Sequence, residues 1–263
     1  MSETSTEPAG TLEVALAHAG RLLETAPALA VEQAEEILKV VPNHPPAVLI
    51  LAQARGRIDG PAAELEILEP LAKAQQKWAA AQFELGLTLG RLGRGDEAVA
   101  ALRRTVALKP KHPEAWRHLG DHLLAQGEAE EADTAFSRHV QASAGQPAMQ
   151  QAAAAMLKND LATAHDVLAA QLARAPNDIT AMRMLAEVAM RGARYEEAGK
   201  LLRRCLEIAP GFAAARYNYA VLLHRRNDPA EAIVEIERLL AAEPRNPSYR
   251  NLLAVLLGRV GEY

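Results

Sequence analysis

The stretch from residue 113 to residue 136 decides the fold, and it reads PEAWRHLGDHLLAQGEAEEADTAF. Four residues of its first half are spaced i, i+3, i+4 and i+7, so they share one face of an α-helix: Trp116, Leu119, Gly120 and Leu123. In its second half, Ala132 and Phe136 are spaced i and i+4 on another helix, and Gly127 lies in the turn between the two. The small Gly120 and Ala132 allow the two helices to approach closely. The large side chains of Trp116 and Phe136 then fill the space beside them. The stretch therefore predicts a tightly packed helical hairpin.

The pattern repeats along the chain with a period of 34 residues, since Leu85-Gly86 precedes Leu119-Gly120 by that distance. Alanines of the second helices recur in steps of 34, 32, 34 and 34 at Ala98, Ala132, Ala164, Ala198 and Ala232. Prolines that close the repeats recur at Pro42, Pro110, Pro176, Pro210 and Pro244. With its W-x2-L-G and A-x3-F spacing, the chain resembles the tetratricopeptide-repeat proteins. The resemblance implies an all-α, right-handed superhelical solenoid of helix pairs.

The repeats are expected to begin near residues 11, 45, 79, 113, 145, 179, 213 and 247. We expect residues 1–10 to form a disordered tail and residues 11–144 to hold repeats 1–4. Residues 145–263 then hold repeats 5–7 and the first helix of a truncated eighth. The boundary follows from the span Ala142 to Ala155, which has few large apolar side chains to bury. This span is either a bend in the solenoid or a merely degenerate repeat.

One repeat departs from the pattern in its second helix. Repeat 2 has Glu64 where the small alanine belongs, directly after Ala63. The neighbouring alanine suggests that this helix is shifted by one residue after Gly60-Pro61.

Composition narrows the functional classes. The chain of 263 residues is 49% hydrophobic but only 4% aromatic, so alanine and leucine form most of the interior. The net charge of −4, with no basic domain, argues against nucleic acid as a main partner. The N-terminus has no signal-peptide pattern, and no run of about 18 apolar residues predicts a membrane span. We therefore expect a cytoplasmic protein, with Cys205 as a small buried side chain.

No arrangement of residues predicts catalysis, a cofactor or a metal. The glycines from Gly86 to Gly95 lie late in a helix and in a turn, whereas a phosphate-binding loop follows a strand. His118 and His122 have a metal-compatible i, i+4 spacing, but no third ligand is evident beside Asp121. We interpret both histidines as structural and expect these residues not to form an enzyme.

The thirteenth position of the repeats carries an arginine series, defined as Arg57, Arg91, Arg191, Arg225 and Arg259. One hypothesis makes it a line of guanidinium groups along the inner, concave surface that holds an acidic, extended segment of a partner protein. The alternative is that each arginine only complements the dipole at the end of its own helix. Further inward-facing candidates are Arg117, Asp121, Arg183, Glu187, Tyr217, Asn218, Val221, His224 and Asn251.

The last predicted helix is apolar on more than one face, with leucines at Leu252, Leu253, Leu256 and Leu257. Terminal units of solenoids need a polar outer face. We expect either that the chain is a fragment of a longer polypeptide or that this helix packs on another chain, including a second copy.

Three phrases in the second half are more distinctive than a generic repeat requires: RMLAEVA at 183–189, APGFAAARYNYA at 209–220 and NPSYRNL at 246–252. They resemble the amino-terminal region of bacterial tetratricopeptide-repeat sulfotransferases, in which the repeats precede a catalytic domain that uses 3′-phosphoadenylyl sulfate. The resemblance implies a non-catalytic arm that recruits a substrate or partner. The competing hypothesis is a free-standing assembly scaffold that oligomerises through its last helix.

Overall fold

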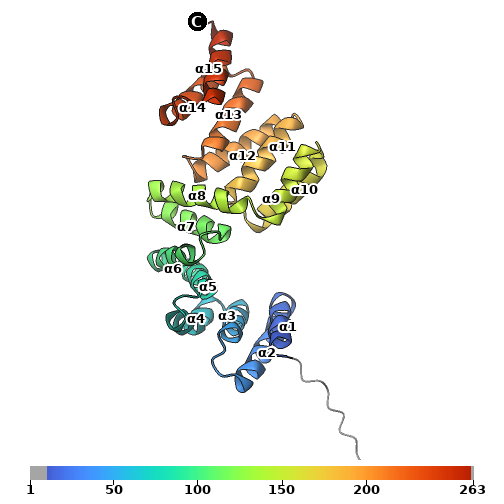
Figure 1. Cartoon of the computed structure of the whole chain (residues 1–263), viewed down its shortest axis with the longest axis vertical. Helices are drawn as coiled ribbons and strands as arrows, with labels where there is room; N and C mark the ends of the chain where they lie inside the picture. The colour runs from blue at the N-terminus through green and yellow to red at the C-terminus, as the bar shows by residue number, and fades with distance from the viewer. Residues whose placement is uncertain (1–10, 262–263) are drawn as a thin grey trace, which may run out of the picture. The chain divides into compact units, whose positions relative to one another are not determined.

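The computed structural model describes residues 11–261, and these residues form fifteen α-helices (Figure 1). The predicted tail at residues 1–10 and the last two residues lie outside this part of the chain. The chain divides into two compact units, Met1–Pro110 and Lys111–Tyr263. The first contains α1 (Leu12–Thr25), α2 (Pro27–Val40), α3 (Pro45–Asp59), α4 (Pro61–Ala74), α5 (Ala79–Arg91) and α6 (Gly95–Leu108).

The second unit contains α7 (Pro113–Ala125), α8 (Ala129–Ser143), α9 (Pro147–Leu157), α10 (Leu161–Arg174), α11 (Ile179–Arg191), α12 (Tyr195–Ile208), α13 (Ala213–Arg225), α14 (Pro229–Ala242) and α15 (Pro247–Val260). Odd-numbered helices pack against the even-numbered helices that follow them, and α15 comes after the seventh pair. The predicted boundary at residue 144 lies between α8 and α9, inside the second unit.

Local sequence explains where the helices begin and turn. Proline occupies the first turn of seven of the described helices, where its missing N–H costs nothing. Asp178 begins α11 by accepting hydrogen bonds from the N–H groups of Thr180 and Ala181 at 3.1 and 3.0 Å. The tight turns within pairs use left-handed residues, such as Gly127 (φ 84°) and Asn227 (φ 62°).

The α7–α8 pair packs as the deciding stretch predicts. Ala132 and Phe136 are buried, each with 1% of its surface exposed. A Cβ added to Gly120 would lie only 2.7 Å from the Phe136 ring, so glycine is what allows that ring to lie across α7. In the first unit, Gly86 faces Leu102 in the same way, at 2.8 Å. The repeated Leu-Gly pairs therefore mark the point of closest helix approach.

The suggested one-residue shift in repeat 2 is wrong. Glu64 itself occupies the small-residue position and is buried (2% exposed), while Ala63 is only half-buried. The position opposite on α3 is Gly56, where an added Cβ would come within 2.8 Å of the Glu64 Cβ. Because Gly56 on α3 has no side chain, the larger Glu64 fits at a position of α4 where other repeats have alanine.

The alanine-rich helix α9 still buries an apolar face. Met149, Ala152, Ala155 and Met156 form one cluster with residues of α10 and α11, including Leu168 and Leu185. Helix α8 makes direct contacts with α11, past the α9–α10 pair. Asp133 of α8 also accepts a hydrogen bond at 3.1 Å from the N–H of Gly211, in the turn before α13. Repeat 4 is therefore attached to later repeats as well as to its neighbour.

The expectation that Leu256 belongs to an exposed apolar surface is wrong. Leu256 is fully buried, because it shares with Tyr249 the face of α15 that is turned into the unit. Leu252, Leu253 and Leu257 are half-buried. Within residues 11–261, no helix combines the length and the apolar character that a membrane crossing requires.

Candidate functional site

Three members of the arginine series, Arg57, Arg191 and Arg225, each link a first helix to the first helix of the preceding repeat. In the first unit, Arg57 donates to the carbonyl oxygen of Leu23 at 2.5 Å and pairs with Glu24 at 2.8 Å. In the second unit, Arg191 donates to the Met156 carbonyl at 2.9 Å, and Arg225 donates to the Met190 carbonyl at 3.3 Å. These carbonyls lie in the last turn of a helix, where the dipole is negative. Those of Met156 and Met190 also accept from the N–H groups of Asn159 and Ala193 in the following turns, each at 3.2 Å.

The arginines therefore complement a helix dipole, but it is the dipole of the first helix in the preceding repeat and not that of their own helix. Each guanidinium has five N–H donors, and this contact uses only one or two of them. The Arg57 and Arg191 side chains are both 40% exposed. The series can thus serve the stack and still present donors to a ligand.

In the first unit, one member of the series, Arg91, contacts a buried carboxylate. Arg91 pairs with Glu64, whose side chain is 3% exposed, and also donates to Thr88 at 3.1 Å. Burial raises the pKa of Glu64, while the Arg91 charge acts to lower it. The pKa of nearby Glu84 is also raised, first by burial and then by the charge of Glu64. Arg57 and Arg91, although predicted together with residues of the later repeats, belong to this separate cluster.

In the second unit, α9 and α11 form a pocket of 290 Å³. Its lining combines apolar and charged side chains: Ala153, Met156, Leu157, Arg183, Met184, Glu187 and Arg191. Three of these, Arg183, Glu187 and Arg191, were predicted from the sequence. The apolar part was missed, although Leu157 offered a signal, because it occupies the thirteenth position of repeat 5 in place of an arginine. Leu157 is 89% exposed.

Charges around this pocket are paired along the helix. Glu187 lies 3.4 Å from Arg183 and 2.6 Å from Arg191, at i−4 and i+4. The pair Arg117–Asp121 on α7 repeats this spacing at 3.4 Å. Burial raises the pKa of Asp121 against the lowering effect of Arg117. The inner faces of α7 and α11 are therefore charged but internally compensated.

The inner faces of α13 and α15 are different, because Arg225 and Arg259 lie near His224 and neither makes an ion pair with a carboxylate in residues 11–261. Burial lowers the pKa of His224, and the nearby charges of Arg259 and Arg225 lower it further. Arg259 makes no hydrogen bond or ion pair with residues 11–261. Asn218 Nδ2 and His224 Nδ1 are buried without a hydrogen-bond partner in the described part of the chain.

Aromatic and apolar groups complete this surface. The rings of Tyr217 on α13 and Tyr249 on α15 lie 5.6 Å apart at an interplanar angle of 38°. Val221 is half-buried, and Asn251 and Val255 are exposed. The structure thus brings the predicted residues of repeats 7 and 8 together on two neighbouring helices.

Two family models described as tetratricopeptide repeat match the chain, over residues 83–147 and 189–256. The chain is a tetratricopeptide-repeat protein. The predicted all-α repeat fold is confirmed, because the chain is also similar to PilF of Pseudomonas aeruginosa, with a TM-score of 0.51 and 14% identity. That match covers 92% of this chain and 96% of PilF.

Two other solved structures match with lower TM-scores. MamA matches with a TM-score of 0.42 and 20% identity, over 68% of this chain and 86% of MamA. A chain of the APC/C hetero-tetramer Cut9–Hcn1 matches with a TM-score of 0.48 and 16% identity, over 94% of this chain and 49% of that one. A comparison with curated proteins gives no match. Tetratricopeptide repeats are protein-interaction modules and typically non-catalytic.

His118 and His122, the two histidines spaced i, i+4 on α7, are half-buried. Burial, together with the Arg117 charge, lowers the pKa of His118 to about 3, and burial lowers that of His122. Among residues 11–261 no group of three or more His, Cys, Asp or Glu side chains is placed to hold a metal ion.

Proposed function

We propose that the inner faces of α9, α11, α13 and α15 bind an extended segment of a partner protein. An apolar side chain of the partner enters the pocket beside Leu157, and acidic groups bind at Arg225 and Arg259. The observation that carries the proposal is this combination of an open apolar pocket and an uncompensated cationic surface on successive first helices. Arginine is suited to the acidic end, because its planar fork can hold a carboxylate with two hydrogen bonds.

The dimensions fit a short segment. Packed helices lie about 8–10 Å apart, so the three steps from α9 to α15 span about 24–30 Å. An extended chain covers about 3.3–3.6 Å per residue, which gives a segment of about seven to nine residues. Side chains of an extended segment alternate in direction, so every second residue faces the groove. The proposal therefore predicts an apolar residue and an acidic residue separated by an odd number of residues.

The test is selection of twelve-residue peptides from a random library on the full chain. We expect enrichment of peptides with one large apolar residue and at least one Asp or Glu. Changing Arg225 and Arg259 together to alanine should weaken a selected peptide by about tenfold or more and flatten its salt dependence. Arg204→Ala is the matched control, since Arg204 is exposed and paired with Glu207 at 3.2 Å. Equal affinity of the double variant and the control would contradict the proposal.

A narrower form of the proposal makes this surface the recruiting arm of a sulfotransferase. Its support is the three phrases of sequence in repeats 6–8, and the two matching family models describe tetratricopeptide repeats and not that enzyme class. The test is the native polypeptide in cell extract, detected with an antibody against this chain. A polypeptide far heavier than 28.3 kDa that transfers sulfate from 3′-phosphoadenylyl sulfate would support this form. A heavier polypeptide without that activity, or one of this mass, would contradict it.

A second candidate function is assembly of copies through α15. Leu253 and Leu257 line a hollow of 290 Å³ together with Leu240 and Pro244 of the preceding repeat. Replacing Leu253 and Leu257 with glutamate should convert a self-associating chain into monomers in light scattering after gel filtration. Leu256→Glu is unsuitable as a test, because Leu256 is buried inside the unit. A chain that is already monomeric before the change would contradict this function.

A further inference from the structure

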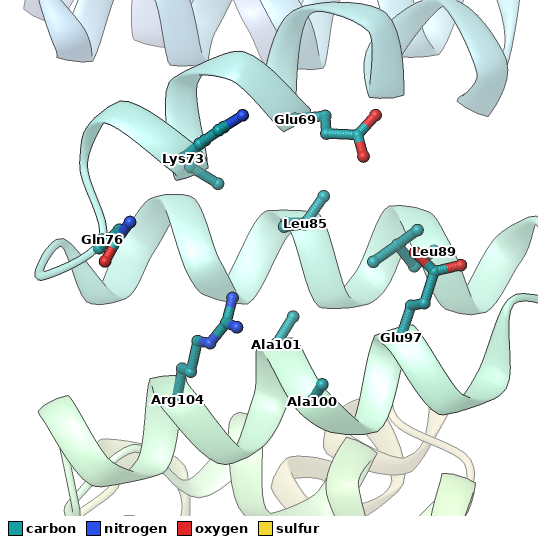
Figure 2. Close-up of a pocket in the computed structure, with 10 residues that line it drawn as sticks. Glu69, Lys73, Gln76, Leu85, Leu89, Glu97, Ala100, Ala101 and Arg104 are labelled. Carbon is teal, nitrogen blue, oxygen red and sulfur yellow. The ribbon is translucent and has the colours of Figure 1, made fainter.

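The first unit has an open groove on the side of its second helices. It has a volume of 510 Å³ and lies between α4 and α6, with Leu85 and Leu89 of α5 as its floor. Figure 2 shows Glu69 and Lys73 of α4 on one side of the floor helix and Glu97 and Arg104 of α6 on the other. The two cations lie toward one end and the two carboxylates toward the other. The groove is separate from the arginine series.

In two other repeats a longer polar side chain stands at one of the two floor positions and contacts a carboxylate of the groove wall. Arg55 stands one period of 34 residues before Leu89, and its guanidinium pairs with Glu35 at 3.2 Å. Glu35 in turn stands 34 residues before Glu69. In repeat 2, therefore, an arginine at the position of Leu89 pairs with the carboxylate at the position of Glu69.

The second unit shows the same arrangement with a different residue. Tyr219 occupies the repeat position of Leu85, and its hydroxyl donates to Glu231 at 3.1 Å. Glu231 occupies the repeat position of Glu97. Arg55 and Tyr219 both have a largely apolar side chain that ends in a hydrogen-bond donor. In each case the donor contacts a carboxylate of the groove wall. The groove of repeat 3 has both carboxylates, Glu69 and Glu97. At the positions of Arg55 and Tyr219, however, it has Leu89 and Leu85.

We propose that the groove between α4 and α6 accepts an arginine side chain of a partner protein, in the position that Arg55 takes in repeat 2. Its methylene stem packs on Leu85 and Leu89, and its guanidinium binds Glu69. Glu69 makes no hydrogen bond or ion pair with the described residues, although it lies close enough to Arg94 for their charges to interact. Glu97 is paired with Arg94 at 2.6 Å. That second pair is exposed and so contributes little, which leaves Glu97 able to share its oxygens.

Charge complementarity selects a single arginine. Lys73 and Arg104 at the other end of the groove repel a second cation, so a polybasic segment is disfavoured. An acidic side chain alone would face Glu69 and Glu97 or would leave the leucine floor uncovered. The site is in the first unit and does not depend on the peptide surface of the second.

The experiment is an NMR titration of the 15N-labelled full chain with N-acetyl-arginine methylamide. The matched probe is N-acetyl-citrulline methylamide, which has the same stem and no charge. We expect shifts confined to α4, α5 and α6 with arginine and at least about fivefold weaker binding of citrulline. Equal binding of the two probes, binding of neither, or shifts elsewhere would overturn the proposal.

Two variants locate the effect. Glu69→Gln should weaken arginine binding by about fivefold, whereas Glu66→Gln, at an exposed position of the same helix, should change it by less than about twofold. Leu85→Tyr should fill the groove as Tyr219 does and abolish binding. Unchanged binding in Glu69→Gln would overturn the proposal even if Leu85→Tyr does not fold.

Discussion

Replacing Asp178 with alanine should lower the free energy of unfolding of the second unit by about 3–5 kcal/mol. Asp178 and His139 form a buried hydrogen-bonded pair at 3.2 Å, with side chains 1% and 2% exposed. The other ring nitrogen of His139 faces the Pro113 carbonyl at 3.0 Å, and Gln171 donates to Asp178 at 2.9 Å. Removing the carboxylate leaves these donors and the start of α11 unsatisfied in a dry interior.

Urea unfolding followed by tryptophan fluorescence can isolate this effect. The chain has two tryptophans, Trp78 in the first unit and Trp116 in the second, so a Trp78→Phe background reports on the second unit. Asp178→Asn is the control, since its side-chain oxygen can still cap α11. We expect Asp178→Asn to lower the free energy of unfolding by less than Asp178→Ala does. A loss below about 1 kcal/mol for Asp178→Ala would show that the pair does not hold α8 to α11.

The same carboxylate gives a pH dependence of stability. Burial acts to raise its pKa, but the hydrogen bonds and charge of His139, with the Ala181 N–H and Gln171, lower it to about 2. A lowered pKa means that the folded state binds the proton less readily than the unfolded state. This contribution is present above the ordinary value of 3.8 and is lost as the pH falls through about 2. Asp178→Asn should remove that part of the acid sensitivity.

Replacing Arg91 with alanine should destabilise the first unit by about 2 kcal/mol at neutral pH, because it leaves the buried carboxylate of Glu64 unpaired. The figure is below that for a fully buried pair, since the Arg91 side chain is 50% exposed. Burial raises the pKa of Glu64, so the folded state binds this proton more readily than the unfolded state. The resulting contribution to stability is present below the ordinary pKa of 4.5 and is lost as the pH rises through the raised value. The cost of Arg91→Ala should therefore shrink as the pH falls.

A second substitution tests the cause. Glu64→Ala restores the small residue that other repeats have, as at Ala98, and should remove most of the cost of Arg91→Ala. Fluorescence of Trp78 in a Trp116→Phe background follows this unit. If the double variant is as unstable as Arg91→Ala alone, the arginine stabilises the stack by capping and not by pairing with Glu64.

The sequence predicted the fold because repetition supplies the same evidence several times. Gly120 opposite Phe136 and Gly86 opposite Leu102 have the packing that their spacing indicated. The error at Glu64 had a physical origin, since the compensating residue, Gly56, lies on the other helix of the pair. The error at Leu256 arose because an all-round apolar helix does not reveal which leucines face inward.

The site was harder to predict, because it depends on contacts between repeats. The arginine series was found by its period, but its bonds to the carbonyls of Met156 and Met190 join residues 35 apart and have no sequence signature. The pocket beside Leu157 and the groove above Leu85 were missed for a related reason. Both lie between successive repeats and are lined by side chains of both, so a single repeat does not reveal them.

The central claim is that the inner faces of α9–α15 bind an extended, acidic segment with an apolar anchor. Its most direct measurement is methyl NMR of the methionines in the full chain, titrated with a library-selected peptide. Met156 and Met184 line the pocket, whereas Met182 lies outside its lining, and all three are buried. We expect the signals of the first two to shift on binding and that of Met182 to stay. Saturable binding that leaves Met156 and Met184 unshifted would contradict the account.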